Sequence, residues 1–101
     1  MTLQEREARA CAIIDSMTEE LRDISLYLHD NPELGLNEHK AVKVINQFLE
    51  NHNFTSQVGL TDLPELQTAL RGDYNGTAQH KIAFLGEYDA LPELGHGCGH
   101  N

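Results

Sequence analysis

The fold is decided by residues 81–92, KIAFLGEYDALP. The segment 81–86 is an apolar run, which is typical of a central strand that is buried on both faces. Two carboxylates follow it directly, Glu87 and Asp89, and an extended backbone points side chains two residues apart to the same face. Because an α/β sheet presents its sites beyond the carboxyl ends of its strands, we predict a functional site here. The alternative is a solvated strand end.

Upstream of this strand, the first third of the chain predicts one long amphipathic helix. Thr2 and Glu5 have the spacing of a capping box, in which each side chain satisfies a backbone amide at the helix start. Pro32 ends the helix, because it biases the residue before it away from helical angles. The apolar stripe of this helix, spaced by three and four residues, consists of Ile14, Met17, Leu21, Ile24 and Leu28. We predict that this stripe faces the core.

A second helix is predicted from 38 to 51, with Asn37 as its N-cap. Its buried face consists of Ala41, Val42, Ile45, Phe48 and Leu49. Beyond it the pattern changes to short extended runs, which predict strands at 54–58 and 66–70 with a loop over 59–64 between them. The predicted fold class is therefore α/β, with two helices followed by about three strands of a mixed sheet.

The composition excludes two classes of function. The chain has 101 residues, and 16 acidic against 7 basic residues give it a formal net charge of -9. Nucleic-acid binders and proteins that bind anionic membranes need a basic face, so neither partner is expected. No apolar run approaches the ~20 residues of a membrane span, and the N-terminus lacks the apolar stretch of a signal peptide. Two cysteines, Cys11 and Cys98, are too few for a disulfide scaffold and predict a cytoplasmic protein.

The last residues, 95–101, have the sequence GHGCGHN and gather metal-binding side chains. His96, Cys98 and His100 alternate with glycines, and thiolate and imidazole are the ligands that zinc and related divalent metals prefer. Glycine lets the backbone turn sharply enough for side chains two residues apart to converge on one ion. A competing hypothesis is a nucleophilic Cys98 with a histidine base. The clustered histidines favour metal binding over that hypothesis.

Two motifs together resemble a known family. The C-terminal motif combines DALP at 89–92 with HGCGHN at 96–101, and the N-terminal motif is LHDNPELG at 28–35 with Glu38 beyond it. In this order, over essentially the whole chain, they resemble the metal-dependent N-acyl-amino-acid amidohydrolases and metallopeptidases of the aminoacylase–glutamate carboxypeptidase superfamily. The most similar branch contains aminobenzoyl-glutamate hydrolase, indole-acetyl-amino-acid hydrolases and related dipeptidases.

The resemblance implies an α/β catalytic domain of the two-metal exopeptidase kind, which holds two divalent metal ions: zinc, manganese, nickel or cobalt. It assigns Cys98 as a ligand between the two ions and His100 as another ligand. Asp89 takes the place of an outer carboxylate that orients a ligand. Glu87 is a further candidate ligand, because relatives outside the branch have a histidine ligand at that position. His96 is expected to structure the loop.

The same resemblance predicts what this chain does by itself. In complete members, the general-base glutamate, further histidine ligands and an inserted dimerisation domain lie downstream of this region. We therefore expect residues 1–101 to be the N-terminal part of a catalytic domain that hydrolyses the amide bond of an N-acyl amino acid, an aminobenzoyl-glutamate-like compound or a dipeptide. Alone, this part is expected to be inactive and to self-associate through an exposed edge. His29 and Glu33 are expected to be structural.

The alternative from another class is a small non-enzymatic interaction module. It would be a helical hairpin on a small sheet, with a structural metal loop formed by cysteine and histidine. Such a module would be monomeric or form one defined oligomer, and it would unfold cooperatively.

Overall fold

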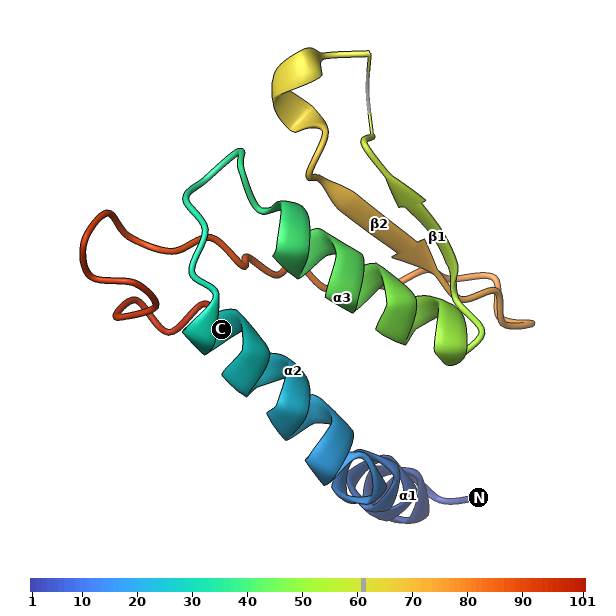
Figure 1. Ribbon diagram of the computed structural model, residues 1–101. Coiled ribbons are helices and arrows are strands. Elements are labelled where there is room, and N and C mark those ends of the chain that lie inside the picture. The colour runs from blue at the N-terminus through green and yellow to red at the C-terminus, as the bar shows by residue number, and fades with distance from the viewer. Residues whose placement is uncertain (61) are drawn as a thin grey trace.

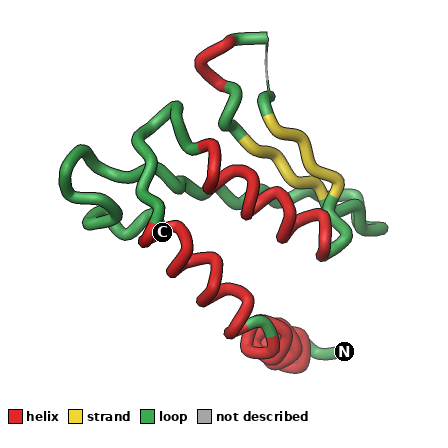
Figure 2. The backbone as a smooth tube through the Cα atoms, in the orientation of Figure 1, coloured by secondary structure: helices red, strands yellow, loops and turns green. Residues whose placement is uncertain are grey.

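The structure is a computed structural model that describes residues 1–60 and 62–101. In chain order its elements are α1 (Leu3–Ser16), α2 (Thr18–Asp30), α3 (His39–Asn51), β1 (Thr55–Val58), the 3₁₀ turn η1 (Pro64–Leu66) and β2 (Leu70–Asp73). Figures 1 and 2 show α3 beside the β1–β2 hairpin, while the C-terminal third runs past α3 and returns to the end of α2. Helices followed by a small sheet confirm the predicted α/β class.

The long N-terminal helix is interrupted at Met17, so the described chain has three α-helices where two were predicted. Ser16 Oγ donates to the carbonyl of Ile13 at 2.6 Å. Thr18 Oγ1 donates to the carbonyl of Asp15 at 2.7 Å. Hydroxyl groups that bond to nearby carbonyls compete with the helical hydrogen bonds, which accounts for the break.

The helix α1 begins with the predicted capping box, but it does not pack as predicted. Thr2 and Glu5 form both halves of the capping box. However, α1 contains no buried residue, and Ile14 is 55% exposed. Figure 1 shows α1 end-on while α2 lies across the view, so the break at Met17 turns α1 away from the other elements. Of the predicted stripe only Leu28 is buried, and the expectation of a core face over its whole length is wrong.

The small core joins the end of α2, the start of α3 and the segment after residue 86. Its buried apolar residues are Leu28, Ala41, Val42 and Ala90. The face of α3 that was predicted to be buried is buried at its first two positions and half-buried at the other three. The residue before the helix is Glu38 rather than the predicted Asn37, and its side chain makes no capping hydrogen bond. Within the described residues, no helix is long and apolar enough to cross a membrane.

The hairpin of β1 and β2 lies against α3. The two strands pair in antiparallel register from Thr55 opposite Asp73 to Val58 opposite Leu70. A side chain at Gly72 would place its Cβ 2.8 Å from a terminal methyl group of Leu49, so glycine permits the close approach of β2 to α3. The first strand agrees with the prediction of 54–58 within one residue.

The second predicted strand, 66–70, is wrong. Pro64 begins the turn η1, and β2 begins only at Leu70. Proline at the first position of a helical turn has its φ angle already set and lacks an amide that needs a partner, which favours the turn over a strand. The predicted loop over 59–64 includes residue 61, which lies outside the described residues.

The predicted central strand over 81–86 is also wrong. This segment is assigned to no strand, and its apolar side chains are exposed rather than buried: Ile82 at 84%, Phe84 at 94% and Leu85 at 100%. A strand buried on both faces needs neighbours on both sides. Among the described residues, the only ladder is that of β1 with β2, and the later segment joins the rest through a parallel bridge between Leu34 and Ala90.

Candidate metal centre

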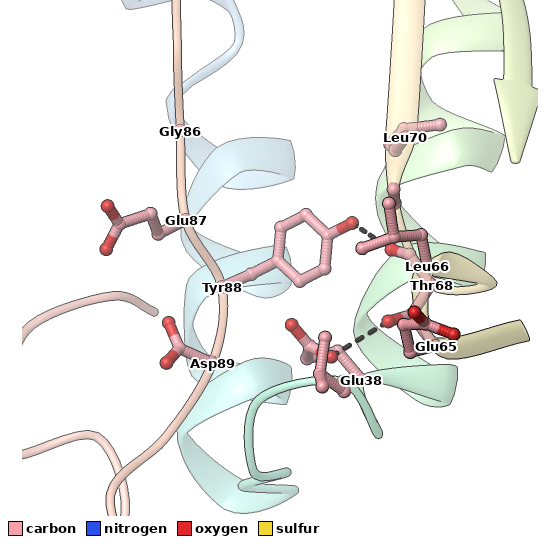
Figure 3. A pocket seen from close by; sticks show the side chains of 11 residues that line it. Glu38, Glu65, Leu66, Thr68, Leu70, Gly86, Glu87, Tyr88 and Asp89 are labelled. Carbon is pink, nitrogen blue, oxygen red and sulfur yellow. Dashed lines mark hydrogen bonds between the residues drawn. The ribbon is translucent and has the colours of Figure 1, made fainter. Parts of the chain in front are cut away.

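The site begins where the exposed apolar run ends. Glu87 and Asp89 point to one side of the chain, and Tyr88 between them points to the other, as Figure 3 shows. This alternation is that of an extended backbone. Both carboxylates contact the same residue, His100. The prediction that the two carboxylates share one face is therefore confirmed.

A tight reversal of the chain brings the glycine-rich loop back to these carboxylates. Leu91 and Gly95 form an antiparallel bridge, with backbone hydrogen bonds of 2.8 and 3.1 Å in the two directions. Inside and after the reversal, Glu93, Gly95 and Gly99 have positive φ angles of 65°, 58° and 82°. Glycine adopts such angles without steric cost. The sharp turns expected of the glycines in this loop are present at Gly95 and Gly99.

His100 lies between the two carboxylates. Its Nδ1 is 2.8 Å from Oδ1 of Asp89, and its Nε2 is 3.1 Å from Oε2 of Glu87. The His100 and Asp89 side chains are about one-third exposed, at 33% and 38%, whereas that of Glu87 is 72% exposed. The imidazole of His100, near the end of the loop, is thus held at both of its nitrogens.

These contacts shift the ionisation of the pair in opposite directions. The hydrogen bond with Asp89 raises the pKa of His100, and the charge of Glu87 adds to this against the opposing effect of desolvation. The hydrogen bond with His100 lowers the pKa of Asp89. Without a metal ion, the site therefore favours an imidazolium between two carboxylates.

The donor set also fits a divalent cation. One atom each of Glu87, Asp89 and His100 lies within 4.8 Å of the others. Two ligand atoms that each bind an ion at 2.0–2.2 Å lie about 3 to 3.5 Å apart, and the 3.1 Å contact between His100 Nε2 and Glu87 Oε2 agrees with that spacing. Asp89 would then hold Nδ1 from behind, as outer carboxylates do for metal-binding histidines.

Cys98 and His96 occupy different positions from this cluster. The thiol of Cys98 is exposed and donates to the backbone carbonyl of Asp89, with Sγ 3.6 Å from the oxygen. Cys98 therefore lies beside the site without joining the three converging ligand atoms. His96 is buried, at 8% exposure, and its Nδ1 has no hydrogen-bond partner among the described residues. Burial within the loop accords with the structural role expected of His96.

A cavity of about 290 Å³ lies on the side to which Tyr88 points. The Tyr88 hydroxyl donates to the carbonyl of Thr68, and Thr68 Oγ1 donates to Oε1 of Glu38 at 2.8 Å (Figure 3). Burial, and then the charge of Glu38, raise the pKa of Tyr88. Glu38 and Glu65 line this cavity. Glu87 and Asp89 line it too, but their carboxylates point away from Tyr88 (Figure 3) and contact His100.

The sequence motif at 28–35 holds the site in place through Glu33. Its carboxylate accepts hydrogen bonds from the amides of Lys40 and Ala41 at 2.9–3.0 Å, which caps α3 from a distance. Its own carbonyl accepts from the amide of Ala90 at 2.7 Å. Glu33 was expected to be structural, which these contacts confirm, but its capping of α3 was not predicted because the two segments meet only in the folded chain.

The end of the loop is anchored by the last residue of the HGCGHN motif, for which no role was predicted. The Asn101 amide donates to Oγ and to the carbonyl of Ser25 on α2, at 3.1 and 3.3 Å. The partners are 76 residues apart, so no local pattern could have indicated the contact.

This chain is similar in sequence to known dipeptidases and hydrolases. No protein-family model matches the chain. The chain is 36% identical over 99 residues to Xaa-Arg dipeptidase from Mus musculus and 32% identical over 102 residues to that from Homo sapiens, covering 92% of this chain and 23% of either relative. It is 34% identical over 89 residues to an uncharacterized hydrolase from Staphylococcus haemolyticus, covering 74% of this chain and 22% of that protein. The chain thus spans about a quarter of the length of the curated relatives it matches.

Proposed function

Because this chain is homologous to part of Xaa-Arg dipeptidase and of related hydrolases, as its motifs predicted, we propose that it contributes half of a two-metal site to a metal-dependent amidohydrolase or peptidase. The observation that carries this proposal is the convergence of Glu87, Asp89 and His100, directly after the apolar run at 81–86. The whole protein of this family would supply the remaining ligands and the general base.

Each residue has a distinct role in this proposal. His100 would hold the ion through Nε2, and Glu87 would hold it through a carboxylate oxygen. Asp89 fixes the His100 ring through Nδ1. Cys98, whose thiol donates to the backbone carbonyl of Asp89, would supply a thiolate ligand to the ions. The bound ions would be zinc, manganese, nickel or cobalt, since mixed sulfur, nitrogen and oxygen donors suit all four.

Such ions polarise an amide carbonyl and lower the pKa of bound water, which is the chemistry that amide hydrolysis requires. The chain's own contribution is to hold ligands and to keep the proton of His100 on Nδ1. That proton is retained by the 2.8 Å contact with Asp89, so Nε2 is the nitrogen left available for an ion.

For the substrate, the proposal favours a dipeptide with a cationic side chain over an aminobenzoyl-glutamate-like compound. Two of the relatives are named Xaa-Arg dipeptidase. Glu38 and Glu65 line the cavity next to the site, and the chain carries a formal net charge of -9. An acidic surface attracts cations and repels a second carboxylate. Isotope-edited NMR with the 101-residue chain would compare Ala-Arg with aminobenzoyl-glutamate, and larger shifts with the latter would contradict this preference.

The metal site is tested by calorimetric titration of the chain with zinc and with manganese. With three or four ligands available, we expect zinc affinity weaker than about 1 µM, because complete structural sites bind far more tightly. His100→Ala and Glu87→Gln should each remove most of the binding. The matched control is His29→Ala, which removes an exposed histidine that lies 3.3 Å from Asp30 and, among the described residues, outside the cluster of Glu87, Asp89 and His100. Equal affinity in His100→Ala and His29→Ala would contradict the proposed site.

Two further outcomes separate the proposal from the alternative class. Submicromolar zinc binding that is lost in both Cys98→Ser and His100→Ala would favour an interaction module with a structural metal loop. We also expect no hydrolysis of dipeptides or N-acyl amino acids by the metal-loaded chain alone. Turnover above that of a Cys98→Ala control would contradict this expectation.

We place this function in the cytoplasm. Cys11 and Cys98 are both free and exposed, and free thiols of this kind persist in a reducing compartment.

A further inference from the structure

The carboxylate of Asp89 is positioned by the loop that follows α2. One residue beyond it, the amide of Ala90 donates to the carbonyl of Glu33 at 2.7 Å. The side chain of Asp89 lies against Gly35, where an added Cβ would be 3.7 Å from Oδ2. Ala90 is itself buried, so this attachment is part of the small core. Asp89 is therefore held by contacts other than the one that it makes with His100.

The imidazole of His100 has a corresponding attachment, also one residue further along the chain. The side-chain amide of Asn101 donates to Oγ of Ser25 at 3.1 Å and to the carbonyl of Ser25 at 3.3 Å. Both residues are half-buried, and Ser25 lies in the second half of α2. A primary amide carries two N–H donors and no competing charge, which suits a hydroxyl and a carbonyl on the same residue. The end of the loop is thus fixed to a helix.

We propose that Ser25 is a positioning residue of the metal centre, which acts through Asn101 to hold His100 against its two carboxylates. This positioning role rests on the proposed function, because among the described residues Ser25 lies outside the cluster of ligand atoms. A site binds well only when its groups are held within about 0.5 Å of the productive geometry by the residues around them. The helix α2 and the loop after it supply that support to both Asp89 and His100.

The other contacts of His100 hold it less firmly. On its N-terminal side, Gly99 has a φ of 82°, and among the described residues no atom beyond its chain neighbours lies within 4 Å of an added Cβ. Glycine in such open space permits many backbone conformations. The side chain of Glu87 is 72% exposed, so it is a mobile partner for Nε2. The attachment of Asn101 to α2 is therefore the contact that limits where the backbone of His100 can lie.

The variants that test this role are Ser25→Ala, Asn101→Ala and the two combined. Alanine favours a helix more than serine does, so Ser25→Ala should leave α2 intact, which circular dichroism would verify. The matched control is Ser16→Ala, which removes a hydroxyl from α1 that donates to the carbonyl of Ile13 at 2.6 Å. A loss seen in Ser25→Ala and absent from Ser16→Ala is then not an effect of removing a helical hydroxyl in general.

The first measurement uses the metal-free chain, kept in EDTA. NMR relaxation would give the order parameter of the His100 backbone amide, which we expect near about 0.85 in the wild type and in Ser16→Ala. In Asn101→Ala it should fall toward about 0.6, the value of a flexible backbone. Ser25→Ala should give an intermediate value, because it retains the longer of the two contacts, with the carbonyl.

The second measurement is calorimetric titration with zinc. Ser25→Ala and Asn101→Ala should weaken binding by about threefold to tenfold. This is less than the roughly 10- to 100-fold loss that follows removal of a direct partner of a metal ligand. The double variant should bind no more weakly than Asn101→Ala, because both substitutions break the same contact. Ser16→Ala should bind zinc as the wild type does.

Three results would overturn the positioning role. The first is an Asn101→Ala chain whose His100 order parameter equals that of the wild type. The second is wild-type zinc affinity in variants that have lost the order of His100. The third is a double variant whose loss is the sum of the single losses, since Ser25 and Asn101 would then act separately. A wild-type chain that binds no zinc would instead contradict the proposed function, and the order parameters in EDTA would decide the positioning of His100 by themselves.

Discussion

Asp89 and His100 form the link that closes the C-terminal loop onto the rest of the chain, with Asp89 Oδ1 2.8 Å from His100 Nδ1 across eleven residues of sequence. The reversal between Leu91 and Gly95 makes this contact possible. The contact also has an electrostatic consequence, since it raises the pKa of His100 above 6.5 and lowers that of Asp89 below 3.8.

Removing the charge of Asp89 should lower the pKa of His100. In Asp89→Asn the largest cause of the upward shift is lost, and the opposing desolvation remains. NMR titration of the imidazole protons would then give a midpoint closer to 6.5 than in the wild type. Glu87→Gln should also lower the pKa of His100, but by less, because the charge of Glu87 contributes less to the upward shift than the hydrogen bond with Asp89 does. A larger drop of the His100 pKa in Glu87→Gln than in Asp89→Asn would contradict this prediction.

The same pair predicts how stability depends on pH. The raised pKa of His100 means that its contribution is fully present below pH 6.5 and is lost as pH rises through the folded-state pKa. The lowered pKa of Asp89 means that its contribution is present above pH 3.8 and is lost as pH falls through the folded-state pKa. The free energy of unfolding of the wild type, minus that of Asp89→Asn/His100→Gln, should therefore be greatest between these two values. Urea titrations at several pH values would measure it, and a difference that does not change with pH would contradict the linkage.

Glu33→Gln should destabilise the chain by about 1 to 2 kcal/mol, the range of a lost helix cap or of a hydrogen bond to a charged group. The Glu33 carboxylate accepts from two amides at the start of α3, where a negative charge also stabilises the helix dipole. Urea unfolding would measure the loss. Glu7→Gln, on the exposed α1, is the matched control and should change stability by less than about 0.5 kcal/mol. Equal effects of the two substitutions would show that the contact with α3 contributes nothing.

Features set by neighbouring residues could be predicted from the sequence. The capping box of Thr2 and Glu5 depends on two side chains within one turn, and both of its hydrogen bonds are present. The placement of Glu87 and Asp89 on one face requires only an extended backbone. Pro32 similarly indicated the end of α2 at Asp30.

Features that depend on distant partners could not be predicted. An apolar stripe indicates that a helix face can be buried, but it does not indicate which element covers that face. The break at Met17 leaves Ile14 55% exposed. The run at 81–86 has the composition of a buried strand, yet among the described residues no neighbouring strand pairs with it. Near the site, Glu33 caps α3 by accepting from the amides of Lys40 and Ala41, seven and eight residues later. The loop between them carries no repeating pattern that would indicate these contacts.

The loop glycines give a final prediction that joins backbone geometry to the site. Gly99 has a φ of 82°, and a side chain there costs about 1 to 2 kcal/mol even though no atom lies within 4 Å of the added Cβ. Gly99→Ala should therefore relieve its strain by shifting the adjacent His100 away from Asp89, which lowers the pKa of His100. Gly97→Ala is the matched control, because Gly97 has no positive φ and its Cβ would meet the Leu94 carbonyl only at 3.4 Å. NMR titration of His100 in both variants would measure the effect. If Gly99→Ala lost stability while the His100 pKa stayed at its wild-type value, the contact with Asp89 would be strong enough to hold the ring against a strained backbone, and the side-chain pair rather than the glycine would position His100.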